Sequence, residues 1–259
     1  MKSNSDTKTN QGNNTHNVSA EEVARFAALA DKWWDPNGPF RPLHKINPVR
    51  LEYIRTQLCQ HFKLKADSMS PLSKLSLLDI GCGGGLISEP LAKIGAKVTA
   101  IDAAEKNIHA AQDHANRYGI NINYKNVSTE ALIANEHKFD VVLALEVVEH
   151  VLDLPSFIKS CSLLTNSGGI VFFSTLNRTP ASWALGIVAA EYILGWLPRG
   201  THTWEKFVKP SELVSLMKKE SLQPIDLSGL SYNILNKNWQ KSSNLSVNYM
   251  ATATNTIKI

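Results

Sequence analysis

The sequence predicts an α/β fold in which a mainly parallel sheet carries helices on both faces. Between Leu75 and Asn177, short apolar segments alternate with longer amphipathic ones, the pattern of strand–helix–strand units. The chain has 259 residues, of which 43% are hydrophobic, so it can bury a sizeable core within one domain. Glycines follow the first of these strands, which is where open α/β sheets place their ligands.

Each expected element follows from its local pattern. Strands are expected at short apolar runs that end in glycine or polar residues, and helices at amphipathic runs between them. The strands are SLLDI, AKVTAID, INYKNVS, FDVVLALE, IVFFSTLN, QPIDLSGLSYN and LSVNYMATATN. The helices are LISEPLAKIG, AEKNIHAAQDHANRYG, a segment from about Pro155, and KPSELVSLMKKESL.

The N-terminal part is expected to form a helical cover over this sheet. Residues 1–17 are polar and are expected to be a disordered tail without a signal peptide. The run SAEE that starts at Ser19 has the pattern of a capping box and predicts a helix to about Trp33. An ordered loop with two tryptophans and four prolines follows, and a second helix is expected from about Pro48. Residues 18–74 are therefore predicted to be a helical lid, and residues 75–177 the ligand-binding core.

The loop after the first strand predicts a nucleoside site. It reads DIGCGGG, and its glycines, Gly81 and Gly83 among them, let a ligand approach the backbone and the following helix N-terminus. Asp102 ends the next strand, where a carboxylate can accept hydrogen bonds from ribose hydroxyls. A dinucleotide fingerprint would need glycine where the chain has Leu86. The glycine loop can also be interpreted as a tight turn between strand and helix that binds no ligand.

The fourth strand ends in a group of polar residues, Glu146, Glu149 and His150. If they form a helical turn, the three side chains share one face. Two carboxylates and an imidazole suit a divalent metal such as Mg²⁺, Mn²⁺ or Zn²⁺. His150 can instead be a general base without a metal. A third interpretation is a solvated helix start. The residues alone leave all three open.

Composition narrows the classes of partner. The net charge of +4 comes without a dense basic stripe, so no nucleic-acid partner is expected, although an anionic lipid surface is compatible. The three cysteines, Cys59, Cys82 and Cys161, have no zinc or disulfide spacing, which fits a reducing compartment.

LLDIGCGGG followed by VTAID resembles the first two motifs of class I S-adenosylmethionine-dependent methyltransferases. The resemblance implies a Rossmann-like, seven-stranded sheet with an antiparallel last strand. The segments WWDPNGPFRPLHKINPVRLEYI, EVVEHV, FFSTLNRT and RGTH are similar to the ubiquinone-biosynthesis O-methyltransferase family, over nearly the whole chain. Membership implies methylation of a catechol-type hydroxyl on 2-polyprenyl-6-hydroxyphenol and 3-demethylubiquinol. The alternative substrate is a soluble small phenol.

The same resemblance implies roles for individual residues. Four positions match cofactor contacts, namely Arg50, Gly81, Asp102 and Leu145. An arginine such as Arg50 can clamp the methionyl carboxylate in a bidentate pair. Glu146, Glu149 and His150 match ligands of a divalent cation, with Mg²⁺ expected, and they are also the candidate catalytic residues. If no metal is present, His150 is the expected proton acceptor.

An apolar segment, Ser182–Pro198, lies within an insert predicted at residues 178–210. One charged residue, Glu191, interrupts it, and tryptophans and basic residues lie near its ends, as at a lipid interface. It is short for a membrane span, so interfacial insertion is expected, and a buried helix over the site is the alternative. The prediction is a cytoplasmic enzyme held peripherally at the inner membrane, with other proteins of ubiquinone biosynthesis as further partners.

Overall fold

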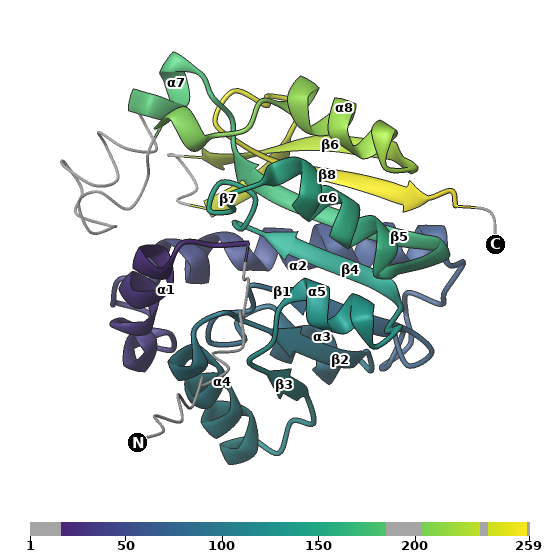
Figure 1. Cartoon of the computed structure of the whole chain (residues 1–259). Helices are drawn as coiled ribbons and strands as arrows, with labels where there is room; N and C mark the ends of the chain where they lie inside the picture. Colours follow the sequence, from purple (N-terminus) through teal and green to yellow (C-terminus); the bar gives the residue numbers. More distant parts are fainter. Residues whose placement is uncertain (1–16, 185–203, 234–237, 258–259) are drawn as a thin grey trace, which may run out of the picture.

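A central sheet organises the chain, as shown in the computed structural model, which describes residues 17–184, 204–233 and 238–257. Within those ranges, eight strands form one sheet in the order β3-β2-β1-β4-β5-β8-β6-β7 (Figure 1). The strands are β1 Ser76–Ile80, β2 Lys97–Ile101, β3 Asn123–Lys125, β4 Phe139–Leu145, β5 Thr165–Leu176, β6 Leu222–Asn233, β7 Asn238–Ser242 and β8 Asn248–Asn255.

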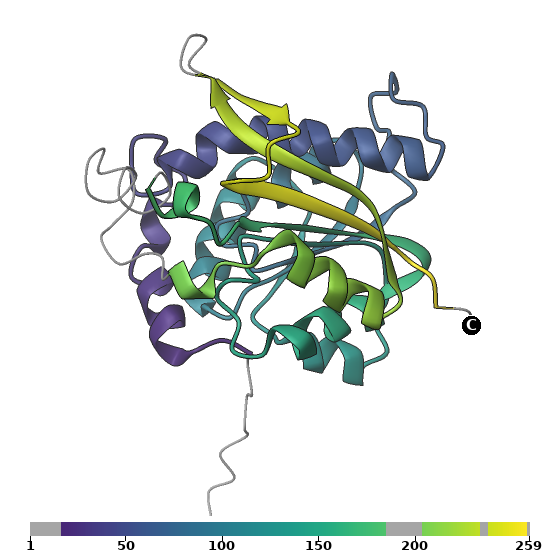
Figure 2. The same ribbon diagram turned by 90° about the horizontal axis from the view of Figure 1, so that it is seen from above.

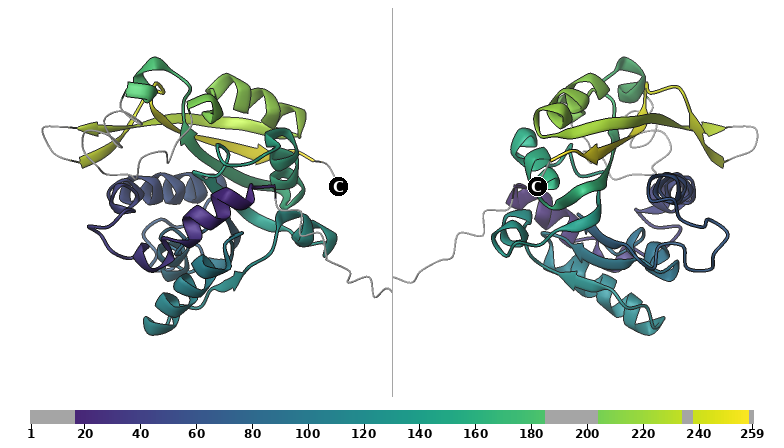
Figure 3. Two further views of the ribbon diagram at one scale, coloured as in Figure 1. Left: turned by 60° about the vertical axis from the view of Figure 1, so that its left-hand side comes forward. Right: turned by 90° about the vertical axis from the view of Figure 1, so that its right-hand side faces the viewer.

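Helices connect and cover these strands. The α-helices are α1 Ala20–Ala27, α2 Arg41–His61, α3 Ser88–Lys93, α4 Glu105–Arg117, α5 Thr129–Ala134, α6 Leu154–Leu163, α7 Pro180–Ser182 and α8 Pro210–Lys219. Two 3₁₀ turns, η1 Ala30–Lys32 and η3 Trp204–Lys206, complete the described helical elements. Figures 2 and 3 show α2 on one side of the sheet and α6 and α8 on the other, as predicted.

The sheet confirms the predicted fold class and corrects its strand count. β1 to β5 are parallel, and β8 inserts antiparallel between β5 and β6. The sequence predicted seven strands, whereas the described residues include an eighth, β7, paired antiparallel with β6 at the sheet edge. β7 was missed because its residues are exposed or half-buried and carry no apolar alternation.

Strand residues point alternately into two apolar layers, which explains why both faces need helices. On one face, Leu77 and Val141 pack with residues of α2, α3 and α4. On the other, Leu78 and Val142 pack with residues of α5, α6 and α8. β1 and β4 are almost entirely buried, as continuous apolar runs in a parallel sheet should be.

Three helical predictions need correction. The first helix was expected to reach about Trp33, but α1 ends at Ala27 and a separate 3₁₀ turn, η1, follows. The second helix was expected from Pro48, but α2 begins at Arg41 and carries Pro48 inside it. An earlier proline, Pro42, lies in the first turn of the observed helix, where proline is well tolerated. The short helix α5 was missed, although Ser128 caps it by accepting a hydrogen bond from the backbone N–H of Ala131.

The predicted polar tail and most of the apolar segment Ser182–Pro198 lie outside the described residues. Of that segment, residues 182–184 are described. Within the part of the chain that the structure describes, no helix is both long and apolar enough to cross a membrane.

Candidate active site

The carboxyl ends of β1, β2 and β4 lie at the same edge of the sheet, because these neighbouring strands run parallel, and this is the edge where open α/β sheets have their ligand crevice. In Figure 1 the arrowhead of β4 points toward the side of the molecule where α1 lies. The glycine loop follows β1, Asp102 follows β2, and Glu146 follows β4. The topology therefore places the expected nucleoside site beside the acidic group, as the sequence predicted.

The first glycine brings the two halves of this crevice into contact. Gly81 has φ +69°, a conformation that glycine adopts without steric cost. A Cβ atom at this position would lie 2.6 Å from Cγ2 of Val147, in the loop after β4. The nucleoside loop and the loop that carries the acidic residues are therefore packed directly against one another.

Asp102 holds the glycine loop in place. Its Oδ2 accepts a hydrogen bond of 2.9 Å from the backbone N–H of Gly83, which has φ +53°. Its Oδ1 accepts bonds from the backbone of Ala104 and the side chain of Asn107, at 2.8 and 3.1 Å. The carboxylate is thus fixed at the end of β2, at the position predicted for ribose recognition.

Arg50 reaches the crevice from α2 and forms a salt bridge with Glu146. The arginine side chain is 2% exposed and the glutamate side chain 22%. Arg50 Nε has no hydrogen-bond partner among the described residues. Leu145 precedes Glu146 as the half-buried last residue of β4. Arg50 and Leu145 thus lie where a cofactor site was predicted, and their contacts with a cofactor stay a prediction.

Glu146 does not begin the expected helical turn. Its φ is +57°, a left-handed conformation that is uncommon outside glycine and typical of strained functional positions. Its Oε1 accepts a hydrogen bond of 2.6 Å from Ser174 Oγ on β5, in addition to the Arg50 contact. The chain therefore turns sharply after β4, and Glu146 does not share a helical face with Glu149 and His150.

The three predicted metal ligands point to different partners. Glu149 is 3% exposed, and its Oε2 accepts a hydrogen bond of 2.8 Å from Thr175. Nδ1 of His150 lies 3.3 Å from the carboxylate of Glu22 on α1. Across the described ranges, no three His, Cys, Asp or Glu side chains are arranged to hold a metal. The described contacts of Glu146, Glu149 and His150 therefore give no support to a shared cation site, which stays a prediction.

Glu22 is a site residue that the sequence analysis missed. Its carboxylate contacts Arg25 at 2.5 Å and Lys206 at 3.6 Å as well as His150. Its place in the SAEE motif suggested a local capping role, and Ser19 does accept a bond from the Glu22 N–H. The Glu22 side chain instead joins α1, η3 and the loop after β4 around the imidazole.

The contacts of this cluster shift its pKa values. Hydrogen bonding to His150 lowers the pKa of Glu22 to about 2, against a smaller opposing effect of burial. Burial favours the neutral imidazole, but Glu22 and Glu149 outweigh it and raise the pKa of His150 above 6.5. Burial, reinforced by the charge of Glu146, raises the pKa of Glu149. Two groups of this loop can therefore exchange a proton near neutral pH, namely His150 and Glu149, whose pKa is raised to about 7.

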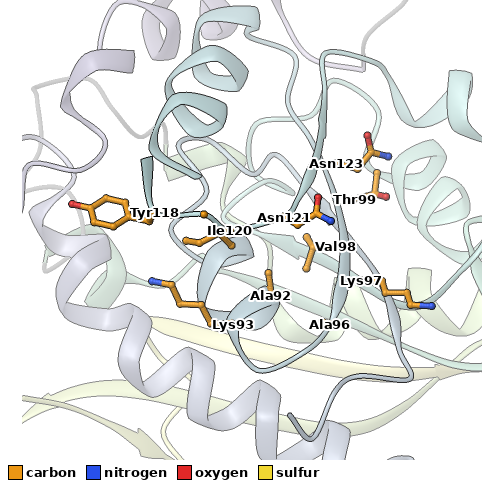
Figure 4. Close-up of a pocket in the computed structure, with 11 residues that line it drawn as sticks. Ala92, Lys93, Ala96, Lys97, Val98, Thr99, Tyr118, Ile120, Asn121 and Asn123 are labelled. Atoms are coloured by element: carbon orange, nitrogen blue, oxygen red, sulfur yellow. The ribbon is translucent and has the colours of Figure 1, made fainter. Parts of the chain in front are cut away.

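A separate surface groove of about 600 Å³ lies at the opposite end of the strands (Figure 4). It is formed near Lys97, where β2 begins, whereas Asp102 follows the other end of that strand. This groove is therefore remote from the strand ends that carry the predicted site. Its lining residues are Ala92, Lys93, Ala96, Lys97, Val98, Thr99, Tyr118, Gly119, Ile120, Asn121 and Asn123.

The sequence of this chain is similar to those of known methyltransferases. A family model described as "Methyltransferase domain" matches residues 50–226. The chain is 50% identical to the ubiquinone biosynthesis O-methyltransferase of Methylobacterium nodulans over 236 residues, 91% of this chain and 95% of that protein. It is 48% identical to the protein of the same name from Pelagibacter ubique, over 91% of this chain and 97% of the relative.

Solved structures confirm the fold. A magnesium protoporphyrin IX methyltransferase from Synechocystis, solved with bound SAH, aligns with a TM-score of 0.59 and 18% identity, over 90% of this chain and 99% of that chain. A Thermotoga maritima SAM-dependent methyltransferase aligns with a TM-score of 0.60 and 14% identity, over 91% and 99%. Together with the close curated relatives, they show that this chain belongs to the ubiquinone biosynthesis O-methyltransferase family, with a Rossmann-like class I methyltransferase fold.

Proposed function

We propose that this protein transfers a methyl group from S-adenosylmethionine to the catechol-type hydroxyl of polyprenylated intermediates of ubiquinone biosynthesis, 2-polyprenyl-6-hydroxyphenol and 3-demethylubiquinol. The contact of Gly81 with Val147 carries the proposal, because it sets the nucleoside loop against the loop of Glu146, Glu149 and His150. A methyl donor bound at the first loop would face a proton acceptor on the second. The names of the close relatives support the same reaction.

S-adenosylmethionine supplies a methyl group that is already activated by its sulfonium. The protein must hold the donor, align the phenol oxygen with the methyl carbon and remove the phenol proton. Asp102 is placed to accept the ribose hydroxyls, and Arg50 to bind the methionyl carboxylate. Alignment of the two reactants can contribute about 7–11 kcal/mol to lowering the barrier.

His150 is the group we assign to the proton. The new oxygen–carbon bond forms as the carbon–sulfur bond breaks, and the phenol proton passes to the imidazole. Glu22 lies beside Nδ1 of His150 and stabilises the imidazolium that results. Because the pKa of His150 is raised, the charged imidazole is favoured after it accepts the proton.

The divalent cation implied by the family resemblance, with Mg²⁺ expected, would require Glu146, Glu149 and His150 to turn toward one another. Their described contacts go to Arg50, Thr175 and Glu22 instead. No step of the proposed mechanism therefore passes through a cation.

We also propose that Ser182–Pro198 docks on an anionic membrane, since the substrate's polyprenyl tail resides in the bilayer. Trp183 is 51% exposed although the preceding residue, Ser182, is buried. An exposed tryptophan that follows a basic residue, Arg178, closely in the sequence suits a lipid interface. In this proposal the enzyme works at the cytoplasmic surface of the inner membrane, and other proteins of the pathway bind it there.

Substitution of Trp183 with aspartate is expected to weaken binding to anionic liposomes on the order of tenfold, the loss of one buried aromatic side chain. Co-sedimentation of the full-length protein measures this. Leu163→Asp on α6 is the matched control, because Leu163 is also exposed, at 40%, but lies elsewhere on the surface. Equal binding by wild type and Trp183→Asp would contradict docking through this segment.

The functional test compares two acceptors that differ in their tail alone. Wild-type protein with labelled S-adenosylmethionine is expected to methylate a short-tailed polyprenyl catechol with a higher kcat/KM than catechol itself. The substrate tail provides apolar binding area that catechol lacks. Equal kcat/KM for the two acceptors would favour the alternative, an O-methyltransferase of a soluble small phenol.

A further inference from the structure

The segment 30–40, here called the strap, lies directly on the glycine loop. A Cβ atom on Gly83 would fall 2.4 Å from the indole ring of Trp33, and one on Gly84 would fall 2.3 Å from its Cβ. The indole stacks on Phe40 with ring centroids 3.6 Å apart. Trp34 adds a hydrogen bond of 2.9 Å from Nε1 to the backbone carbonyl of Gly84. The strap and the predicted cofactor loop therefore form one packed unit.

A chain of hydrogen bonds connects the strap with Asp102. Nε1 of Trp33 donates to Oδ1 of Asn107 on α4 at 2.9 Å. Nδ2 of Asn107 donates to Oδ1 of Asp102 at 3.1 Å, and Asp102 accepts from the N–H of Gly83 through Oδ2. Asn107 is 1% exposed and Trp33 is 7% exposed. The bond between Trp33 and Asn107 is buried, where leaving a polar group without its partner is costly.

The chemistry of the three side chains fixes the direction of this chain. An indole can only donate a hydrogen bond, and an ionised carboxylate can only accept. A carboxamide does both, so Asn107 must turn its oxygen to Trp33 and its nitrogen to Asp102. Without the indole N–H, the buried amide oxygen loses its donor, and the amide is held by its contact with the carboxylate alone. Trp33 thus anchors Asn107 in the position from which its nitrogen donates to Asp102.

We propose that Trp33 and Asn107 are positioning residues for the cofactor, holding the Asp102 carboxylate in the orientation that accepts the ribose hydroxyls. This inference rests on the proposed function, because it needs a cofactor with a ribose. It assigns the strap a role beyond covering the crevice. Packing of the strap on the glycine loop orients the carboxylate that recognises the nucleoside, so cofactor affinity depends on a residue of the N-terminal cover.

The test compares binding of S-adenosylhomocysteine with binding of its analogue that lacks both ribose hydroxyls, measured by calorimetry on the full-length protein. Asn107→Leu removes the donor to Asp102, and Trp33→Phe removes the N–H while keeping an aromatic ring to stack on Phe40. Both variants are expected to bind S-adenosylhomocysteine about tenfold more weakly, the effect of one hydrogen bond to a charged group. Affinity for the analogue should stay unchanged.

Gln112→Leu is the matched control, since Gln112 is a carboxamide on the same helix that donates to Asn116. It should retain the wild-type preference for S-adenosylhomocysteine over the analogue. Trp33→Phe keeps the test decisive if Asn107→Leu does not fold. Variants that retain the full preference, or that lose affinity for both ligands equally, would overturn the inference. Wild-type protein that binds neither ligand would instead refute the proposed function.

Discussion

Replacing His150 with glutamine should lower kcat for methyl transfer by about 10²–10⁴-fold, the usual contribution of a general acid–base group. Glutamine retains hydrogen-bonding capacity toward Glu22 but cannot accept the phenol proton at neutral pH. Binding of S-adenosylhomocysteine should persist, because His150 is not among the predicted cofactor contacts. Steady-state kinetics with labelled S-adenosylmethionine and a short-tailed polyprenyl catechol measure the first effect, and calorimetry measures the second.

The pH dependence of kcat gives this prediction a second readout. A base must be neutral to accept a proton, so activity should rise with pH through the pKa of His150, which lies above 6.5. Glu22 raises that pKa, so Glu22→Gln should move the rising limb to lower pH. A wild-type activity near that of His150→Gln at every pH would contradict the role as base. If EDTA abolishes wild-type activity and Mg²⁺ restores it, the imidazole belongs to a cation site instead.

Replacing Arg50 with methionine should destabilise the protein by about 3 kcal/mol, at the lower end of the roughly 3–5 kcal/mol for breaking a buried ion pair. The lower end applies because Glu146 keeps 22% exposure and some access to water. The carboxylate of Glu146 would retain Ser174 Oγ as a donor but lose its counter-charge. Urea unfolding followed by circular dichroism measures the free energy of unfolding.

Arg55→Met on the same helix is the control. Arg55 pairs with Glu52, its side chain is 35% exposed, and such surface pairs contribute less than about 1 kcal/mol. Adding Glu146→Gln to Arg50→Met should recover part of the lost stability, because it removes the uncompensated charge. Equal losses for the Arg50 and Arg55 variants would show that the ion pair in the crevice is not structurally important.

The sequence predicted the parts of the fold that depend on local patterns. Continuous apolar runs predicted the buried strands β1 and β4. The glycine loop and Asp102 predicted a nucleoside site at the carboxyl ends of the strands. β7 could not be predicted because its residues are mostly exposed and its pairing with β6 is a tertiary contact. α2 begins before Pro48 because tertiary packing overrides the low helix propensity of proline. The residues just before it, Ile46 and Asn47, are buried.

The sequence could predict where the site lies on the sheet, but not which of its side chains contact one another. The end of β4 placed Glu146 as expected, yet spacing could not indicate that its backbone is left-handed and does not begin a helical turn. Glu22 and Asn107 were missed for a similar reason. Glu22 lies far along the chain from His150, and Asn107 far from Trp33, and neither sits in a pattern that singles out its side chain. Long-range polar contacts of this kind leave no local signal in one sequence.

The most direct test of the central claim is where the methyl group ends up on the acceptor. Wild-type protein is incubated with S-adenosylmethionine carrying an isotopically labelled methyl group and with a short-tailed polyprenyl catechol, and the product is examined by NMR. We predict a labelled methyl resonance at the position of an aryl ether, formed on the catechol oxygen. A label on a ring carbon, or no transfer to the catechol at all, would contradict the assignment as an O-methyltransferase of this substrate class.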